Sequence, residues 1–159
     1  MATRDEKEVF LQTYLRARRK EYTLRRRLEQ IQIDCRVPGC KPIDGMPHAR
    51  GRITDLSDAM VEIDRALMMV AAQKREADLL RTIVLDAIDK VEKKNLCHVL
   101  KQKHIHGLKN SQVAKNMGVS PGRVTQMYSE ALEVFEIPPL NRPRSRKLVE
   151  KYSNAGLTS

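Results

Sequence analysis

Apolar side chains recur at alternating spacings of four and three residues near the start of the chain. The positions that keep this spacing are Phe10, Tyr14, Ala17, Leu24, Leu28 and Ile31. Glu21 is the one interruption. A 4-3 repeat is typical of a coiled-coil seam rather than of the wider apolar face of a globular helix. It predicts one long helix over residues 5–33.

A second 4-3 pattern predicts another long helix over roughly residues 55–91, with Thr54 as its N-cap. Lys74 and Arg81 interrupt this pattern. Its apolar positions are Met60, Ile63, Leu67, Val70, Ala77, Val84, Ile88 and Val91. Between the helices, residues 34–53 contain three Pro and three Gly and predict a loop. We therefore expect an antiparallel, coiled-coil-like helical hairpin over residues 5–91, with enough exposed seam to pair with a second copy.

The rhythm changes after residue 91, where three short helices are predicted at about 93–105, 110–117 and 121–135. Gly107 and Gly118 separate them. This pattern predicts a small domain over 92–136. Residues 137–159 form a basic C-terminal tail, for which either a short helix around 145–153 or disorder is expected. The expected fold class is all-α: the hairpin, then the small domain.

The residues between the second and third short helices are those of a helix-turn-helix. Ala114 is small where two helices must approach closely, and Gly118 suits a turn that needs a positive φ. The side chain of Val119 is expected to pack from the turn into the core. Ser120 can cap the next helix, and Pro121 suits its first position. The predicted buried face of that helix consists of Val124, Met127, Ala131 and Leu132.

This burial leaves one face of the helix that starts at Pro121 directed outward, as a candidate surface for a DNA major groove. Arg123 can bind a guanine edge or a phosphate, Gln126 can pair with adenine, and Thr125 can contact a thymine methyl group. The candidate DNA contacts on this helix are Ser120, Gly122, Arg123, Thr125, Gln126 and Ser129. Candidate phosphate contacts on the preceding helix are Lys109, Ser111, Gln112 and Lys115. Arg142 and Arg144 are expected to extend the footprint as a flexible arm.

Charge and composition favour the same kind of partner. The chain has 30 Lys and Arg against 20 Asp and Glu, a formal net charge of +10, which favours a polyanion. It has no Trp and few other aromatic residues to stack single-stranded bases, so duplex DNA is preferred. No apolar run is long enough for a membrane span, and the N-terminus does not resemble a signal peptide. We therefore expect a cytoplasmic protein with no membrane partner.

Other candidate chemistry is weak. Cys35 and Cys40, with Asp44 and His48 nearby, provide only one close cysteine pair, so no metal site is expected. His98, His104 and His106 are interpreted as surface or helix-end histidines. No catalytic grouping and no phosphate-binding glycine loop is present, and we expect neither catalysis nor a cofactor. The basic run from Arg16 to Arg27 is more typical of a solvated helix face than of a binding site.

At residues 96–135 the chain resembles region 4 of sigma-70-type RNA polymerase sigma factors. The resemblance lies in the glycine-leucine at 107–108, the VAKNMGVS turn and the RVTQMYSEAL helix. As a whole, roughly over residues 8–136, the chain is similar to small sigma-region-4-like regulators of phages and prophages of Gram-positive bacteria, including the ArpU/RinA-type late-gene activators. The resemblance implies a sequence-specific DNA-bound activator of phage late genes that also contacts polymerase. No counterpart of sigma region 2 is present, so a complete sigma factor is not implied.

The chain departs from region 4 at Pro121, Gly122 and Thr125, and these departures favour a first rival function. This rival is a regulator that binds RNA polymerase or a sigma factor without reading DNA. A second rival is a small terminase-like DNA-packaging subunit of a phage, although such subunits usually begin with their DNA-binding unit. The candidate partners are therefore duplex DNA, RNA polymerase and a second copy of the chain.

Overall fold

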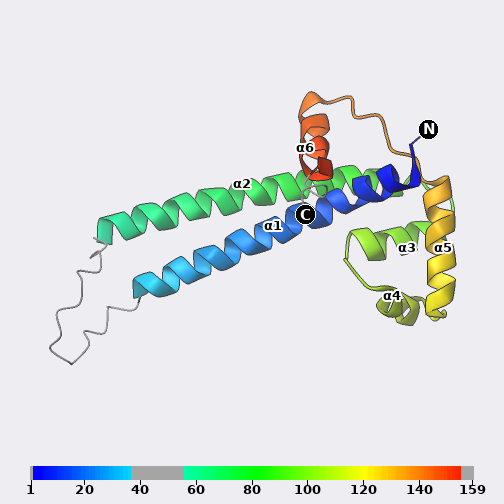
Figure 1. Cartoon of the computed structure of the whole chain (residues 1–159), viewed down its shortest axis with the longest axis horizontal. Helices are drawn as coiled ribbons and strands as arrows, with labels where there is room; N and C mark the ends of the chain where they lie inside the picture. Colours follow the sequence, from blue (N-terminus) through cyan, green and yellow to red (C-terminus); the bar gives the residue numbers. More distant parts are fainter. Residues whose placement is uncertain (1, 37–55, 155–159) are drawn as a thin grey trace. The chain divides into compact units, whose positions relative to one another are not determined.

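The structure is a computed structural model that describes residues 2–36 and 56–154. These residues form six helices and no strand: α1 (Arg4–Arg36), α2 (Leu56–Ile88), α3 (Lys94–His104), α4 (Asn110–Met117), α5 (Pro121–Val134) and α6 (Pro143–Asn154) (Figure 1). The all-α expectation is therefore confirmed. Within the described part of the chain, no helix combines the length and apolar character that a membrane crossing requires.

The chain divides into two compact units that share the long helices. Residues 1–19 and 75–159 form unit 1, and residues 20–74 form unit 2. Each boundary falls inside a helix, since α1 and α2 both continue through it. These limits differ from the predicted division at 91/92, because a change of hydrophobic period marks a change of helix packing but not the limits of a shared core.

Unit 1 holds most of the buried apolar side chains. The first half of α1 contributes Phe10, whose ring lies 6.0 Å from the ring of Phe135 just after α5. Both side chains are almost fully buried. Further buried residues come from α1 and from all the remaining helices: Leu11, Leu80, Val84, Ile88, Val99, Leu100, Val113, Val124, Leu132 and Leu148. The small helices α3 to α5 therefore share one core with the ends of the long helices.

The expected seam of α1 is confirmed, but that of α2 is partly wrong. In α2, Met60 and Leu67 are exposed, and the seam passes instead through the buried Ala59, the half-buried Ala66 and the buried Gln73. Buried and half-buried positions run through the helix and past its end at Ala59, Ile63, Ala66, Val70, Gln73, Ala77, Leu80, Val84, Ala87 and Val91. This unbroken 4-3 repeat removes the interruptions at Lys74 and Arg81. The prediction chose Met60 and Leu67 because they are more hydrophobic than alanine, but Ala59 and Ala66 occupy the corresponding seam positions.

Helix ends differ from the expected ones by a few residues. Helix α1 continues through residues 34–36, which were assigned to the loop, and α2 ends at Ile88 rather than near 91. The remainder of the predicted loop, with the expected N-cap Thr54, lies outside the described residues.

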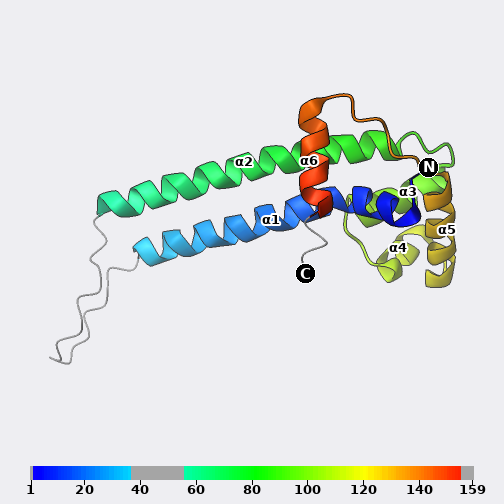
Figure 2. The same cartoon turned by 45° about the horizontal axis from the view of Figure 1, so that its top comes forward.

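The basic tail contains a packed helix rather than a flexible arm. Helix α6 buries Leu148, Val149 and Tyr152, and Figures 1 and 2 both show it beside α1 and α2. The Arg16 guanidinium donates to the carbonyl oxygens of Tyr152 at 2.8 Å and Ser153 at 3.1 Å, so it caps the C-terminal end of α6. The flexible-arm expectation was wrong because the apolar side of α6 has a surface to pack on.

The corrected seam of α2 predicts opposite effects for two adjacent residues. Leu80 is fully buried and Arg81 is exposed. We expect Leu80→Ala to lower the free energy of unfolding by ~2–5 kcal/mol, because it leaves a cavity in the core. We expect Arg81→Ala to change it by less than about 0.5 kcal/mol, as surface substitutions usually do. Urea unfolding followed by circular dichroism measures both, and equal effects would contradict this register.

Candidate nucleic-acid interface

The turn between α4 and α5 has the geometry that the sequence predicted. Gly118 ends α4 in the left-handed conformation, with φ 67° and ψ 32°. The amide of Val119 then donates to the carbonyl oxygen of Ala114 at 3.1 Å. The Oγ of Ser120 accepts a hydrogen bond from the amide of Arg123 at 3.2 Å, and Pro121 takes the first helical position. The turn thus ends one helix and starts the next within three residues.

Burial on one side fixes which side of α5 faces outward. All four residues predicted for the buried face are buried: Val124, Met127, Ala131 and Leu132. Val113 and Ala114 of α4 are buried against them. The first turns of α5 therefore present their polar side chains to solvent.

Most of the candidate contact residues are exposed. On the α4 side these are Lys109, Ser111, Gln112 and Lys115. On the α5 side they are Ser120, Gly122, Arg123, Thr125 and Gln126. We call these nine residues the α4–α5 face.

Hydrogen bonds already orient several side chains of the α4–α5 face. Arg123 donates through Nη1 to the side-chain oxygen of Gln126 at 3.3 Å. The Thr125 hydroxyl accepts from Nδ2 of Asn110 at 3.2 Å and donates to the carbonyl oxygen of Pro121. Because this hydroxyl is engaged on both sides, its methyl group is the part left to meet a base. Asn110 was missed by the sequence analysis, since only the turn brings it beside α5.

Gln112 has a structural task besides its candidate role. Its side-chain oxygen accepts a hydrogen bond from the amide of Lys109 at 3.0 Å, at the start of α4. Its side-chain nitrogen is the atom that remains suited to a phosphate oxygen.

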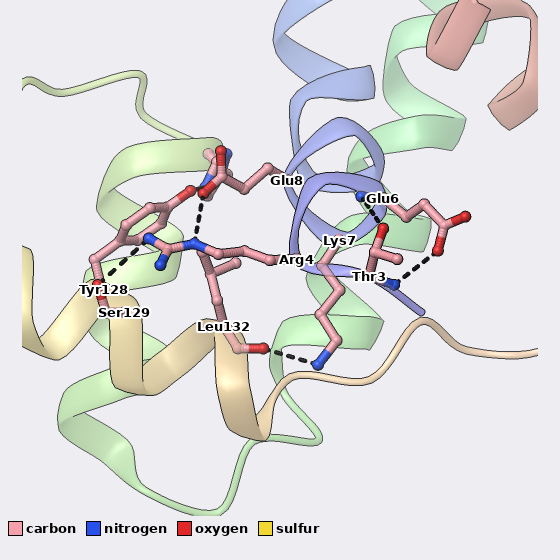
Figure 3. Close-up of polar contacts among 9 residues, drawn as sticks. Thr3, Arg4, Glu6, Lys7, Glu8, Tyr128, Ser129 and Leu132 are labelled. Atoms are coloured by element: carbon pink, nitrogen blue, oxygen red, sulfur yellow. Dashed lines mark hydrogen bonds and ion pairs between the residues drawn. The ribbon is translucent and has the colours of Figure 1, made fainter. Parts of the chain in front are cut away.

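Ser129 lies outside the α4–α5 face because the first turns of α1 cover this part of α5 (Figure 3). Its hydroxyl accepts a hydrogen bond from Arg4 at 3.4 Å. The ammonium group of Lys7 donates to the carbonyl oxygens of Leu132 at 2.8 Å and Glu133 at 3.3 Å. A cation at these carbonyls also favours the negative end of the helix dipole. The sequence offered no signal for this contact, which joins residues 125 positions apart.

Two lysines next to α5 were also missed. Lys93 and Lys94, at the start of α3, line a groove together with Arg123 and Glu130. Lys93 forms an ion pair with Glu130 at 2.5 Å, and this contact lowers the pKa of the Glu130 carboxyl group. With one acid neutralised by one lysine, Lys94 and Arg123 give the groove its positive charge.

Arg142 and Arg144 are exposed but do not belong to the α4–α5 face. Arg144 lies in the first turn of α6 and lines a surface groove with Arg75, Lys147 and Lys151. Lys151 is paired with Glu76 of α2 at 2.8 Å. Arg144 is therefore carried by a helix whose polar contacts run to α1 and α2, and Arg142 directly precedes this helix.

The three clustered histidines lie at the surface or at a helix end, as expected, but His104, the last residue of α3, is also buried. His98 and His106 are exposed, but His104 is 4% exposed. Its Nε2 lies 3.1 Å from the Tyr128 hydroxyl, and no hydrogen-bond partner is found for its Nδ1. Burial, with a contribution from the Lys103 charge, lowers the pKa of His104 to about 4. The neutral ring therefore belongs to the core between α3 and α5.

The described residues contain no group of three or more His, Cys, Asp or Glu side chains placed to hold a metal ion. Cys40, Asp44 and His48, and the side chain of Cys35, lie outside the described part of the chain.

Comparisons with known proteins found no match. No protein-family model, no curated protein and no solved structure matches the chain significantly. The function of this chain is therefore inferred from its own sequence and structure.

The two glycines near the turn should respond in opposite ways to alanine. Gly118 has φ +67°, whereas Gly122 lies in the first turn of α5 with open space around it. We expect Gly118→Ala to cost ~1–2 kcal/mol, since a Cβ is strained at positive φ. Gly122→Ala should stabilise by up to about 1 kcal/mol, because alanine favours the helix. Thermal and urea unfolding compare them, and a neutral Gly118→Ala would contradict the strained turn.

Burial of His104 predicts a loss of stability in mild acid. Its pKa is about 4 in the folded protein and 6.5 when exposed, so the unfolded chain binds the proton more readily between these values. Stability should therefore fall as pH drops from 6.5 towards 4, by up to about 3 kcal/mol from this group.

His104→Gln removes the titrating ring and should flatten this dependence relative to the unaltered chain. His106→Gln removes an exposed histidine and is the matched control, expected to lose stability over the same interval as the unaltered chain. Urea unfolding across this pH range measures all three proteins. Parallel curves for His104→Gln and the unaltered chain would show that His104 does not cause the loss.

Proposed function

We propose that this protein is a sequence-specific, double-stranded DNA-binding regulator of transcription that uses α4 and α5 as a helix-turn-helix. The observation that carries the proposal is the outward row of Arg123, Thr125 and Gln126 on a helix capped by Ser120. The N-terminal half of such a helix is what enters a major groove in proteins of this kind. Gly122 has no side chain and open space around it, which favours a close approach of the first turn of α5 to a duplex.

In this proposal Arg123 is the main base-reading residue. A guanidinium can donate two hydrogen bonds to O6 and N7 of guanine. Gln126 already accepts a hydrogen bond from Arg123, which suits a role in orienting that guanidinium. The alternative is that Gln126 leaves Arg123 and pairs with adenine by itself. The methyl group of Thr125 is placed for a thymine.

Phosphate contacts would come from the sides of the same surface. Lys109, Lys115 and the side-chain nitrogen of Gln112 are on the α4 side, and Lys94 is on the α3 side. Such contacts carry no sequence information but fix the register of a protein on its duplex. The net charge of +10 supports this electrostatic part of the binding.

The biological setting rests on the resemblance of residues 107–132 to sigma region 4. It favours a regulator of phage late genes, most simply an activator, that acts in the bacterial cytoplasm. RNA polymerase is then the second proposed partner, since region 4 of a sigma factor works on the enzyme as well as on the promoter. The exposed Val134 near the end of α5, with 47% of its surface accessible, is an apolar contact available to a protein partner.

Arg123→Ala and Gln126→Ala test the proposed reading. Each should weaken binding to the selected site by ~1–3 kcal/mol, about 5- to 150-fold in the dissociation constant. If Gln126 acts by orienting Arg123, the double variant should lose little more than Arg123→Ala alone. Fluorescence anisotropy with the duplex recovered by selection from random sequences gives the constants, and Arg81→Ala is a control that removes an exposed arginine of α2.

A salt titration separates the two kinds of contact. Lys109→Ala and Lys115→Ala should weaken binding to all duplexes alike and reduce the dependence on salt. If neither Arg123→Ala nor Gln126→Ala weakens binding to the selected duplex, α5 is not the helix that reads the bases. A chain that binds no duplex but is retained by RNA polymerase would instead be the polymerase-binding regulator.

A further inference from the structure

Unit 2 buries few of the apolar residues that it contains. Only three of its described residues are buried: Leu28, Ala59 and Gln73. A cavity of about 280 Å³ remains between its two helix segments, lined in part by Leu24 and Ile31. In the same unit seven successive residues of α2, 66–72, are apolar. A helix that is apolar around most of its circumference is normally covered on more than one side.

The uncovered side of α2 is an ordered stripe. Met60, Asp64, Leu67, Ala71 and Lys74 are all exposed and follow a 4-3 spacing. Each one directly follows a buried or half-buried position of the α2 seam, so the stripe is the same repeat turned by about 100° around the helix. Met60 and Leu67 have 60% and 45% of their surfaces accessible. We call these five residues the α2 stripe.

We propose that the α2 stripe binds the same stripe of a second copy of this chain, with the two helices antiparallel. The order of charges along the stripe carries this choice. Asp64 lies on one side of Leu67 and Ala71, and Lys74 on the other. A two-fold axis then brings Asp64 opposite Lys74 of the second copy at both ends of the contact. A parallel arrangement would instead place like charges opposite one another, which opposes association.

The side chains between the charges also complement each other in size. With Asp64 opposite Lys74 of the second copy, Leu67 lies opposite Ala71, so a large residue meets a small one on each side. Met68, 74% exposed, lies beside the stripe at the edge of this contact. The contact is closed, because both copies use the same patch and the pair occupies both patches. It does not depend on DNA binding.

The test is sedimentation equilibrium of the full chain without DNA at micromolar concentrations. We expect twice the mass of one chain. Leu67→Glu should shift the protein to single chains, and Ala72→Glu is the matched control, since it adds the same charge at an exposed position outside the α2 stripe. Circular dichroism checks that the helices persist in both variants.

A charge exchange tests the antiparallel arrangement. Asp64→Lys should raise the dimer dissociation constant roughly tenfold or more, because lysines then face each other at both ends. Adding Lys74→Asp to this variant should restore it. A single-chain mass for the unaltered protein would overturn the proposal, as would a dimer that Leu67→Glu leaves intact. Failure of the double exchange to restore association would overturn the antiparallel pairing.

Discussion

The packing of the first half of α1 against the end of α5 is the contact on which unit 1 depends. Phe10 meets Phe135 in the core, and Lys7 binds the last carbonyl groups of α5. Arg16, further along the same helix, does the same for the end of α6. One helix thereby secures the C-terminal ends of two others. Apolar contact and charge act together, since the cations lie where the helix dipoles are negative.

The contacts of α1 with α5 also determine which part of α5 remains exposed to solvent. The C-terminal half is covered by Arg4 and Lys7, whereas the N-terminal half carries Arg123 and Gln126 into solvent. These contacts fix the C-terminal half of α5 to α1, and a helix that is held by packing positions its exposed side chains more precisely than a loop does. The neutral His104 and Tyr128 belong to the same packing, and they link α3 to α5 by a half-buried hydrogen bond.

Unit 2 has the opposite character. Its α2 segment exposes large apolar residues such as Met60 and Leu67, whereas its buried residues are Ala59 and Gln73. Small residues at a seam allow two helices to approach closely but bury little apolar surface, so their pairing gains little from the hydrophobic effect. The exposed methionines and leucine of α2 hold more apolar surface that could still be buried, and they suit association with another chain.

The sequence by itself determined the helices, the turn at Gly118, the cap at Ser120 and the buried face of α5. These depend on neighbours within a few positions, through backbone conformation and helical period. It did not determine the α2 seam, because two sets of positions one residue apart both follow the 4-3 spacing. The more hydrophobic residues at Met60 and Leu67 favoured the set that is exposed in the structure. Only the tertiary structure decided that Arg4 meets Ser129, that Lys94 lies beside Arg123, that His104 is buried and that α6 is packed. Such contacts join distant parts of the chain, and whether they form depends on the shape of the whole core.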